Sequence, residues 1–394
     1  MHRVGGDVTN PLHIALIGTR GVPAAYGGFE TAVEEIGRRL VGKGHRVTVY
    51  CRDKGGAGRD YLGMTRVVLP AVRRKALETL SHTALSVAHS ARDRPDVAIV
   101  FNAANSPFLP VLRTFRVPVA LHMDGLEWRR SKWGGAGKRF YRGAELFGVR
   151  TADALIADSP GIADYYRHQF DARTELIAYG APQLRSADPA GVENLDLRPN
   201  GYHLAVARFE PENHVREIVA GYAKSSATKP LAVVGSAPYS EGYIKEIRQL
   251  AQKDSRIRLL GAVYDQKLLD SLYFHAYAYI HGHSVGGTNP SLLRAIGAGT
   301  AVIAYDVSFN RAVIEGRGWF FRTEDEVASA VLAAEGAAEQ VSREGAYLRE
   351  HASRRYTWDS VAVQYENLAY RLHGGETMRP SHKRATRNPV AWDE

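Results

Sequence analysis

An apolar strand, a glycine-rich turn and the start of a helix follow one another in His13-Ile-Ala-Leu-Ile-Gly-Thr-Arg-Gly-Val-Pro-Ala-Ala-Tyr-Gly-Gly-Phe-Glu30. The apolar run His13–Gly18 has the length of a short buried strand. From Phe29 to Leu40, apolar residues recur with helical spacing at positions 29, 32, 33, 36 and 40. A strand that passes through glycines into a helix is typical of a parallel sheet covered by helices.

The same alternation continues and then starts again in the second half of the chain. In the first half we predict further strands at Arg46–Tyr50, Val97–Phe101, Val117–His122 and Ala154–Ala157, and a helix at Leu77–Ala91. The second set of strands is predicted at Tyr202–Arg208, Leu231–Gly235, Ile257–Leu260, Tyr277–His281 and Ala301–Tyr305. The sequence therefore predicts an α/β protein with two doubly wound domains facing a central cleft.

Polar segments set the expected domain boundaries. Residues 183–200 are polar and lack periodicity, so we expect a linker between an N-terminal domain at 1–182 and a C-terminal domain that begins at 201. Residues 374–394 are polar, basic and proline-containing, which predicts a disordered tail. Because ligands of doubly wound domains bind at the carboxyl ends of the strands, the cleft is the expected site.

The composition is that of a globular protein. Of 394 residues, 45% are hydrophobic and 24% charged, which excludes disorder over most of the chain. The sequence contains no run of about 18 apolar residues, so no membrane span is predicted, and no secretory signal is expected at the N-terminus. The single cysteine, Cys51, allows neither an internal disulfide nor a cysteine-based zinc site, and it fits a reducing cytoplasm.

The excess positive charge lies in the first half of the chain. Residues 1–182 contain 26 Lys and Arg against 17 Asp and Glu, whereas the remaining residues contain 25 of each. We therefore expect the first half to bind an anionic partner, which can be nucleic acid, an anionic membrane or a phosphorylated substrate. Since the chain carries no nucleic-acid-binding motif, nucleic acid is the least favoured of the three.

Two features point to phosphate binding after the first strand of each half. Gly27 and Gly28 allow close approach of a ligand to a helix N-terminus, and Arg20 lies nearby in the sequence. The spacing is not the G-x-G-x-x-G of a dinucleotide-binding turn, which argues against a dehydrogenase. In the second half, Arg208 follows a strand, where a guanidinium can bind two oxygens of a diphosphate. The alternative interpretation of Arg208 is an ordinary surface charge.

A third stretch is His281-Gly-His-Ser-Val-Gly-Gly-Thr-Asn-Pro-Ser-Leu-Leu-Arg294. Its glycine pair precedes Asn289 and Pro290, which are suited to capping and opening a helix. Backbone N–H groups there can form an anion nest, although an ordinary capped helix start would give the same pattern. His281 and His283 have no carboxylate or cysteine cluster beside them, so we expect no metal site. The candidate donor-binding residues in this stretch are Gly286, Gly287, Thr288, Asn289, Ser291 and Arg294.

The fourth stretch, Leu121-His-Met-Asp-Gly-Leu-Glu-Trp-Arg-Arg-Ser-Lys-Trp133, also follows a strand. Asp124 and Glu127 are expected at the mouth of the cleft, where either carboxylate can orient an acceptor hydroxyl. Trp128 and Trp133 can stack on a sugar or pack beneath a loop, and packing is the favoured alternative for tryptophan alone.

These stretches resemble glycosyltransferase family 4, and more narrowly a bacterial branch that includes rhamnosyltransferases of cell-surface polysaccharide assembly. The residues that carry the resemblance are GTRGVPAAYGGFETAVEE, GHRVTVYCR, DGLEWRRSKWG, ARFEPEN, HGHSVGGTNPSLL and YTWDSVAVQYENL, within residues 12–372. The resemblance implies a GT-B fold of two Rossmann-like domains, and retaining transfer of a sugar from a nucleoside diphosphate donor to a saccharide acceptor. A lipid-linked acceptor and deoxythymidine-diphosphate rhamnose as donor fit this branch, with no metal or further cofactor.

The resemblance also assigns expected roles. Gly27 and Gly28 would lie under the donor diphosphate, Arg208 would hold it, and Asn213 stands where the broader family has a diphosphate-binding lysine. Asp124 falls near the reacting sugar, so Asp124 and Arg208 are the expected catalytic residues. Residues 201–357 would form the donor domain, and a helix at 358–373 would cross back to the first domain. The expected acceptor-binding residues are Tyr26, Glu127, Trp128, Arg129 and Arg130.

Two positions depart from the pattern of the family. Arg294 stands where a glutamate normally holds the donor ribose, and Ala312 where a glutamate often follows the sequence FNR. These departures leave open a second interpretation, a degenerate and non-catalytic member that binds a ligand or a partner protein.

A basic stretch predicts membrane docking. Between positions 113 and 142 only Asp124 and Glu127 oppose the basic residues, and aromatic residues are interleaved with them. This pattern favours a peripheral position on an anionic membrane, at its inner face, although a solvated helix face would give the same pattern. The basic residues are Arg113, Arg116, Arg129, Arg130, Lys132, Lys138, Arg139 and Arg142.

Overall fold

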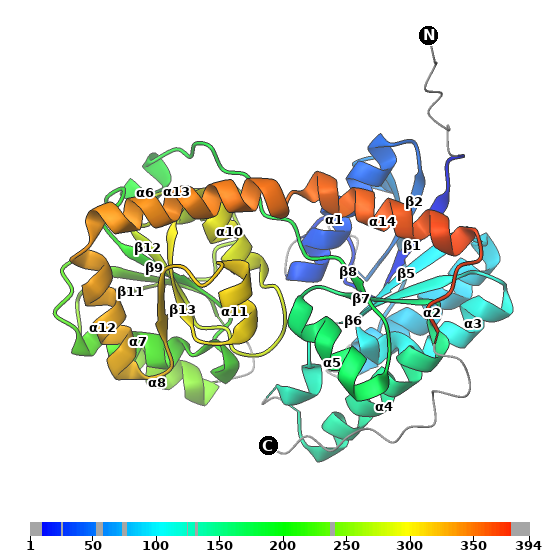
Figure 1. The fold of residues 1–394 in the computed structure, drawn as a ribbon, viewed down its shortest axis with the longest axis horizontal. Coiled ribbons are helices and arrows are strands. Elements are labelled where there is room, and N and C mark those ends of the chain that lie inside the picture. Colours follow the sequence, from blue (N-terminus) through cyan, green and yellow to red (C-terminus); the bar gives the residue numbers. More distant parts are fainter. Residues whose placement is uncertain are drawn as a thin grey trace, which may run out of the picture.

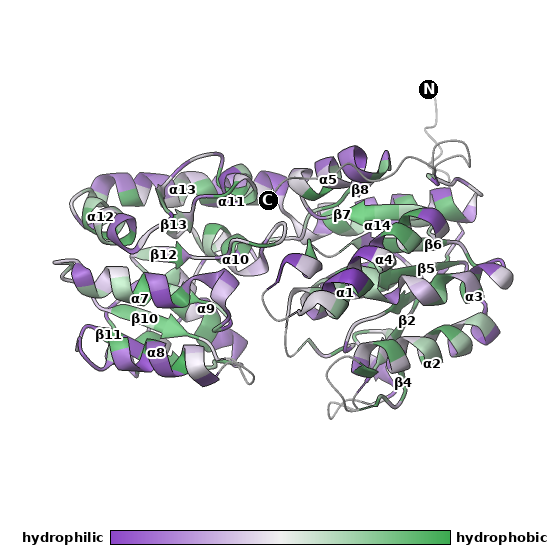
Figure 2. Ribbon diagram, turned by 90° about the horizontal axis from the view of Figure 1, so that it is seen from below, coloured by the Kyte–Doolittle hydropathy of each residue, from purple (hydrophilic) through white to green (hydrophobic). Residues whose placement is uncertain are grey.

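Two α/β units lie side by side in the computed structural model (Figure 1). The structure describes residues 10–24, 27–52, 58–72, 77–123, 125–130, 133–236 and 241–379. Each unit has one largely parallel sheet with helices on both faces, as the sequence predicts. Figure 2 shows the mainly hydrophobic strands enclosed by helices with hydrophilic outer sides.

The first sheet has the strand order β3-β4-β2-β1-β5-β6-β7-β8, and only β3 is antiparallel to its neighbour. Its strands are β1 (His13–Ile17), β2 (Arg46–Cys51), β3 (Asp60–Tyr61), β4 (Met64–Val68), β5 (Val97–Phe101), β6 (Val119–Met123), β7 (Ala154–Ala157) and β8 (Glu175–Leu176). The short 3-10 helices are η1 (Ala103–Phe108) and η2 (Glu127–Arg129).

Alternating side chains of these strands build a core on each face of the first sheet. Ile14 and Leu16 of β1 pack in the cluster formed by α1 (Gly28–Gly42) and α14 (Trp358–His373). Ala15 and Ile17 face the opposite cluster, because successive strand residues point to opposite sides. That cluster contains residues of α2 (Leu77–Asp93), α3 (Leu109–Thr114), α4 (Gly135–Thr151) and α5 (Pro160–Phe170).

The second sheet has the order β11-β10-β9-β12-β13-β14, with all neighbours parallel. Its strands are β9 (His203–Val206), β10 (Leu231–Val234), β11 (Ile257–Gly261), β12 (Ala278–His281), β13 (Ala301–Tyr305) and β14 (Trp319–Phe321). One face packs on α7 (Val215–Lys224), α8 (Glu241–Ala251) and α12 (Glu324–Glu335), and the other on α6 (Ala190–Glu193), α9 (Gln266–Phe274), α10 (Pro290–Ala298) and α13 (Ala338–Arg355). The remaining elements are η3 (Pro211–Asn213) and α11 (Ser308–Val313).

The chain passes between the two units twice, and the two connecting segments are in contact. The backbone N–H of Ala181 donates to the carbonyl of Tyr356 at 2.6 Å, just before α14 begins. α14 then lies on α1 of the first unit, where Glu366 pairs with Lys43 at 2.7 Å and with His45 at 3.0 Å. The segment predicted as a linker contains the short helix α6; the domain boundaries themselves stay a prediction.

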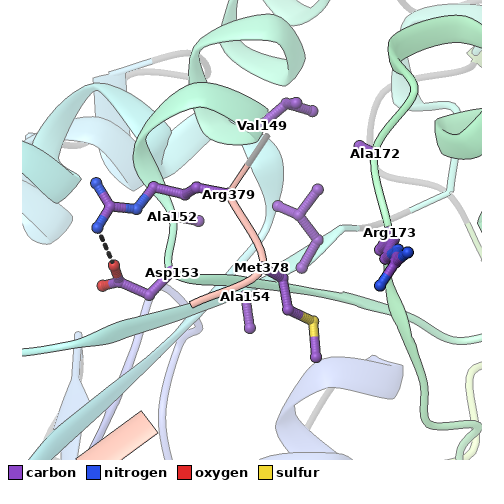
Figure 3. Close-up of a pocket in the computed structure, with 9 residues that line it drawn as sticks. Val149, Ala152, Asp153, Ala154, Ala172, Arg173, Met378 and Arg379 are labelled. Carbon is purple, nitrogen blue, oxygen red and sulfur yellow. Dashed lines mark ion pairs between the residues drawn. The ribbon is translucent and has the colours of Figure 1, made fainter. Parts of the chain in front are cut away.

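The start of the predicted tail lies against the first unit. The backbone N–H of Met378 donates to the carbonyl of Asp153 at 2.7 Å, and the guanidinium of Arg379 pairs with the carboxylate of Asp153 at 3.1 Å (Figure 3). Residues 377–379 thus contact the residue before β7, and residues 380–394 lie outside the described residues, so the disorder of the tail stays a prediction. None of the described helices is both long and apolar enough to cross a membrane.

Candidate active site

The carboxyl ends of both sheets open into one cavity of about 660 Å³ between the two units. In each sheet the strand order reverses beside the first strand of the unit, between β1 and β5 and between β9 and β12. Loops that follow these strands diverge at such points, which leaves room for a ligand. Thr19, Asn102, Arg208 and His281 line the cavity from these four strand ends.

Gly27 and Gly28 line the cavity at the N-terminus of α1. Gly27 has a φ of 103°, a conformation that a side chain would strain. A Cβ at Gly28 would come within 2.8 Å of Pro290, so this loop touches the first turn of α10 across the cavity. Glu30 also lies in this turn, where it accepts from the N–H of Arg20 at 3.1 Å, and burial raises its pKa.

The second glycine loop joins the two units at the start of α10. Asn289 caps the helix by accepting from the N–H of Ser291 at 2.9 Å. The Thr288 hydroxyl donates to the carbonyl of Asp158 in the first unit at 2.7 Å. Gly286 and Gly287 line the cavity, and a Cβ on either glycine would collide with neighbouring atoms or strain the backbone. All four residues that follow Val285 therefore line the cavity.

Arg208 reaches the cavity from the end of β9, and its guanidinium lies 3.5 Å from Glu210. Asn213 supports this loop by donating to the carbonyl of Arg208 at 2.8 Å, while its amide oxygen lies 2.7 Å from Nδ1 of His283. Burial, together with His281 and the guanidiniums of Arg130 and Arg208, lowers the pKa of His283 well below its ordinary value. The imidazole of His283 is therefore neutral near neutral pH, and the positive charges around it are the guanidiniums of Arg130 and Arg208.

Arg294 lines the cavity from the second turn of α10, but its guanidinium is engaged by side chains of helix α9. Its guanidinium pairs with Asp270 and donates to the side-chain oxygen of Gln266 at 2.9 Å. The sequence did not indicate this pairing, because both partners lie more than twenty residues away. Ala312, the other departure, lies in α11 outside the cavity lining.

The expected acceptor-binding residues separate into two groups. Glu127 and Arg130 line the cavity and pair with each other at 2.7 Å. Trp128 and Arg129 lie outside the lining; the Trp128 ring packs against the guanidinium of Arg142, at 4.2 Å. This agrees with the packing alternative for Trp128. Asp124 and Tyr26 lie outside the described residues.

Some lining residues were not among the predicted site residues. Arg52 at the end of β2 reaches the cavity with Thr79, to which it donates at 3.1 Å. Its place directly after an apolar strand was a usable signal, the same one that identified Arg208. Tyr179, Tyr273 and Trp358 supply aromatic walls and had no comparable local signal. Among the described residues, no group of three His, Cys, Asp or Glu side chains is arranged to hold a metal ion.

Two family models match the chain, one in each unit. The model of the glycosyl transferase 4-like domain matches residues 27–180, and the model of glycosyl transferases group 1 matches residues 202–335. The two ranges together cover well over half of the chain and include nearly all of the cavity lining described above. Among curated proteins, no sequence matches this chain.

Solved structures share the architecture over nearly the whole chain. Sucrose-phosphate synthase from Thermosynechococcus elongatus gives a TM-score of 0.81 at 20% identity, covering 92% of this chain and 99% of that chain. Anabaena HepE in complex with UDP-glucose gives 0.73 at 15% identity, with 91% and 100% covered. A UDP-forming α,α-trehalose-phosphate synthase from Burkholderia vietnamiensis gives 0.66 at 11% identity, with 93% and 100% covered. At these identities the likeness establishes the fold.

Proposed function

This chain belongs to glycosyltransferase family 4, whose members have the GT-B fold and transfer a sugar from a nucleotide-sugar donor with retention, and we propose that it transfers rhamnose to a lipid-linked saccharide in cell-surface polysaccharide assembly. The observation that carries the donor site is the cavity in which two glycine loops, two helix N-termini and Arg208 meet. The motif GTRGVPAAYGGFET supports the choice of sugar and acceptor.

The proposed donor site lies at the start of α10. There the residues of the Gly286–Asn289 loop and Arg208 line the same cavity as Gly27 and Gly28. A helix N-terminus and a guanidinium both favour a diphosphate, and they favour it more as negative charge develops on the leaving group. The complexes of HepE with UDP and UDP-glucose support a nucleotide-sugar ligand for this fold.

The proposed reaction needs no strong base from the protein. The bond between the anomeric carbon and the diphosphate oxygen breaks, and the acceptor hydroxyl forms the new bond on the same face. The hydroxyl proton passes to the departing phosphate oxygen. Arg208 stabilises the developing charge, and we assign Asp124 to the orientation of the reacting sugar or acceptor. Glu127 and Arg130, on the first unit's side of the cavity, are the proposed acceptor contacts.

A non-catalytic member is the second candidate function, and Arg294 favours it. This residue is bound by Asp270 and Gln266, so the cavity wall lacks the glutamate that the family resemblance implies for the donor ribose. Such a protein would bind a nucleotide without cleaving its sugar.

We also propose that helices α3 and α4 dock the protein on an anionic membrane. The two helices contact each other, and their only acidic residue, Glu145, is buried. The exposed residues include both cations and phenylalanines, the combination that binds an anionic interface. They are Val111 of α3, Phe115 and Arg116 directly after it, and Lys138, Arg139, Phe140, Arg142, Phe147 and Arg150 of α4.

A panel of nucleotide sugars tests the proposed function. A donor at 100 times its dissociation constant should stabilise the protein by about 2.7 kcal/mol, so thermal unfolding identifies the preferred donor. The enzyme should then hydrolyse that donor slowly without acceptor and transfer the sugar to extracted lipid-linked saccharides. Binding without hydrolysis or transfer would favour the non-catalytic alternative, and preference for another sugar would refute the assignment of rhamnose.

A further inference from the structure

His281 ends β12 at the floor of the cavity, and none of the proposed donor contacts includes it. The residue is 3% exposed and lines the cavity. Its Nε2 atom has no hydrogen-bond partner among the described residues. A buried polar atom without a partner costs about 1–3 kcal/mol, so this nitrogen is expected to have a function with a ligand.

The other ring nitrogen belongs to a chain of hydrogen bonds that leads to the N-terminus of α10. Nδ1 of His281 lies 3.2 Å from the Tyr279 hydroxyl, which lies 2.9 Å from the hydroxyl of Ser291. The Ser291 hydroxyl lies 2.7 Å from the side-chain oxygen of Asn289, the capping residue of the helix. The imidazole is therefore connected through two hydroxyl groups to the first turn of α10.

Proton counting gives this chain two states, in which the single proton of the Tyr279 hydroxyl can go to Ser291, to Nδ1 or to the carbonyl of Val206, which lies 3.2 Å away. In the first state, Nδ1–H donates to Tyr279, Tyr279 donates to Ser291 or to Val206, and Ser291 donates to Asn289, which makes three bonds and leaves a lone pair on Nε2. In the second, Tyr279 donates to Nδ1 and Ser291 donates to Tyr279 or to Asn289, which makes two bonds and places the proton on Nε2. The first state is favoured without a ligand because it contains one more hydrogen bond.

An anion at the start of α10 reverses this preference. Nε2–H then donates to an anionic oxygen, a charge-assisted bond that exceeds the one neutral bond that this state gives up. Burial lowers the pKa of His281 to about 3, so the ring changes tautomer and stays neutral.

We propose that His281 is a donor-binding residue whose Nε2–H donates to a phosphate oxygen of the nucleoside diphosphate, and that Tyr279 and Ser291 set its tautomer. This inference rests on the proposed donor site at α10 and adds to it a residue with a defined protonation state. The neighbouring His283 cannot take this role. Its Nδ1–H donates to the amide oxygen of Asn213, so its Nε2 carries a lone pair and no proton to donate.

Substitutions of His281 test the contact by calorimetry with two pairs of ligands, UDP against uridine and dTDP against thymidine. We expect His281→Leu to weaken the nucleoside diphosphate that wild type prefers by about 10- to 100-fold, and to leave the matching nucleoside unchanged. We expect His281→Gln to recover most of the affinity, because its amide N–H extends to a similar place. Equal diphosphate affinity of wild type and His281→Leu would overturn the inference.

Nitrogen-15 NMR of the histidine ring tests the tautomer in the unaltered protein, so it does not depend on whether a variant folds. The signal of His281 is assigned by its loss in His281→Gln. We expect Nδ1–H without ligand and Nε2–H with the preferred diphosphate. An Nδ1–H tautomer that persists in a saturated complex would also overturn the inference. If wild type binds neither UDP nor dTDP, the proposed donor site itself is wrong.

Discussion

Arg208 is the residue on which the proposed donor chemistry depends most directly. Its side chain remains 39% exposed and faces the cavity, and Glu210 lies 3.5 Å from it. Because a charge-assisted contact contributes about 1.5–3 kcal/mol, we expect Arg208→Ala to lower kcat/KM for donor hydrolysis by about 10- to 150-fold. Stopped assays of nucleotide release measure this change.

The matched control for Arg208 is Arg322→Ala. Arg322 is an exposed arginine with a similarly long ion pair, 3.3 Å from Asp306, and it lies outside the cavity lining. We expect its activity to equal that of wild type, and both variants to melt within a few degrees of it. An Arg208→Ala enzyme with unchanged turnover would exclude the guanidinium from the reaction.

Arg294 and Asp270 must be exchanged together to test the departure from the family pattern. Arg294→Glu alone sets a second carboxylate beside Asp270, so we expect a loss of stability of about 1–3 kcal/mol and weaker donor binding. With Asp270→Asn added, the repulsion is relieved and the glutamate is free to accept from ribose hydroxyls. We expect this double variant to bind UDP more tightly than wild type in calorimetry. Weaker binding would show that Arg294 itself contacts the donor.

His122 makes stability sensitive to acid. Its ring is fully buried and stacked between Phe101 and Tyr179, and burial lowers its pKa to about 3. The unfolded chain binds this proton below pH 6.5, so the stability is complete above pH 6.5 and falls as pH drops toward 3. For one such group, the free energy of unfolding is about 2 kcal/mol lower at pH 5 than well above pH 6.5.

The variant His122→Phe keeps an aromatic ring in the stack and removes this proton. We expect its free energy of unfolding in urea to fall by about 2 kcal/mol less than that of wild type between pH 7 and pH 5. Parallel pH dependences of the two proteins would show that His122 takes up its proton in the folded state.

At the scale of elements, α14 fixes the second unit to the first through a buried histidine. His45 is 1% exposed; its Nδ1 accepts from the N–H of Leu12 at 3.0 Å, so Nε2–H must donate to Glu366. Glu366→Ala leaves that buried donor unpaired, and we expect a loss of about 1–3 kcal/mol in calorimetric unfolding. The control is Asp359→Ala on the same helix.

Asp359 pairs with Arg39 at 2.6 Å but is 85% exposed. Because exposed ion pairs contribute little, we expect less than about 1 kcal/mol from Asp359→Ala. Equal losses in the two variants would mean that net charge on α14, rather than the buried contact, holds the helix in place.

The sequence predicted the central strands because their burial on both faces gives continuous apolar runs. β1, β2, β5, β7, β9, β10, β12 and β13 begin at or next to their predicted positions, and so does the edge strand β11. The strands β3, β8 and β14 were not predicted, since they are only two or three residues long and lie at sheet edges. β4 was also missed; it carries a buried arginine, Arg66, whose guanidinium donates to the carbonyl of Val22 at 2.8 Å, and this breaks the apolar pattern.

At the scale of the whole molecule, the candidate site followed from one rule about parallel sheets. Residues that follow strands converge, so Gly27, Arg208 and Gly286 could be placed in one cleft from sequence. Pairings between distant elements could not be predicted, because sequence position does not specify which helix a charge will face. Arg294 with Asp270 is such a case, and the packing of Trp128 against Arg142 is another.

The proposed membrane docking would be a property of the surface that α3 and α4 form together. Phe140 and Phe147 are two turns apart on α4 and therefore share a helix face, and each is about 40% exposed. Lys138 and Arg139 are exposed beside them. Of the basic residues predicted to dock, Arg130 instead pairs with Glu127 at the cavity and Lys132 lies outside the described residues. The proposed docking surface is therefore centred on α4.

Two pairs of substitutions separate the electrostatic and apolar parts of this docking. Each cation near an anionic surface contributes about 1 kcal/mol, so Lys138→Ser with Arg139→Ser should weaken binding to anionic vesicles by about 10- to 30-fold, with the difference shrinking as salt is added. Phe140→Ser with Phe147→Ser should weaken binding by a factor that salt leaves unchanged, because burial of apolar area is not screened. The matched control is Val363→Ser with Leu332→Ser, which removes equally exposed apolar residues from α14 and α12, on other faces of the molecule. Vesicle sedimentation that gives the same affinity for all four proteins would show that α4 does not dock on the membrane.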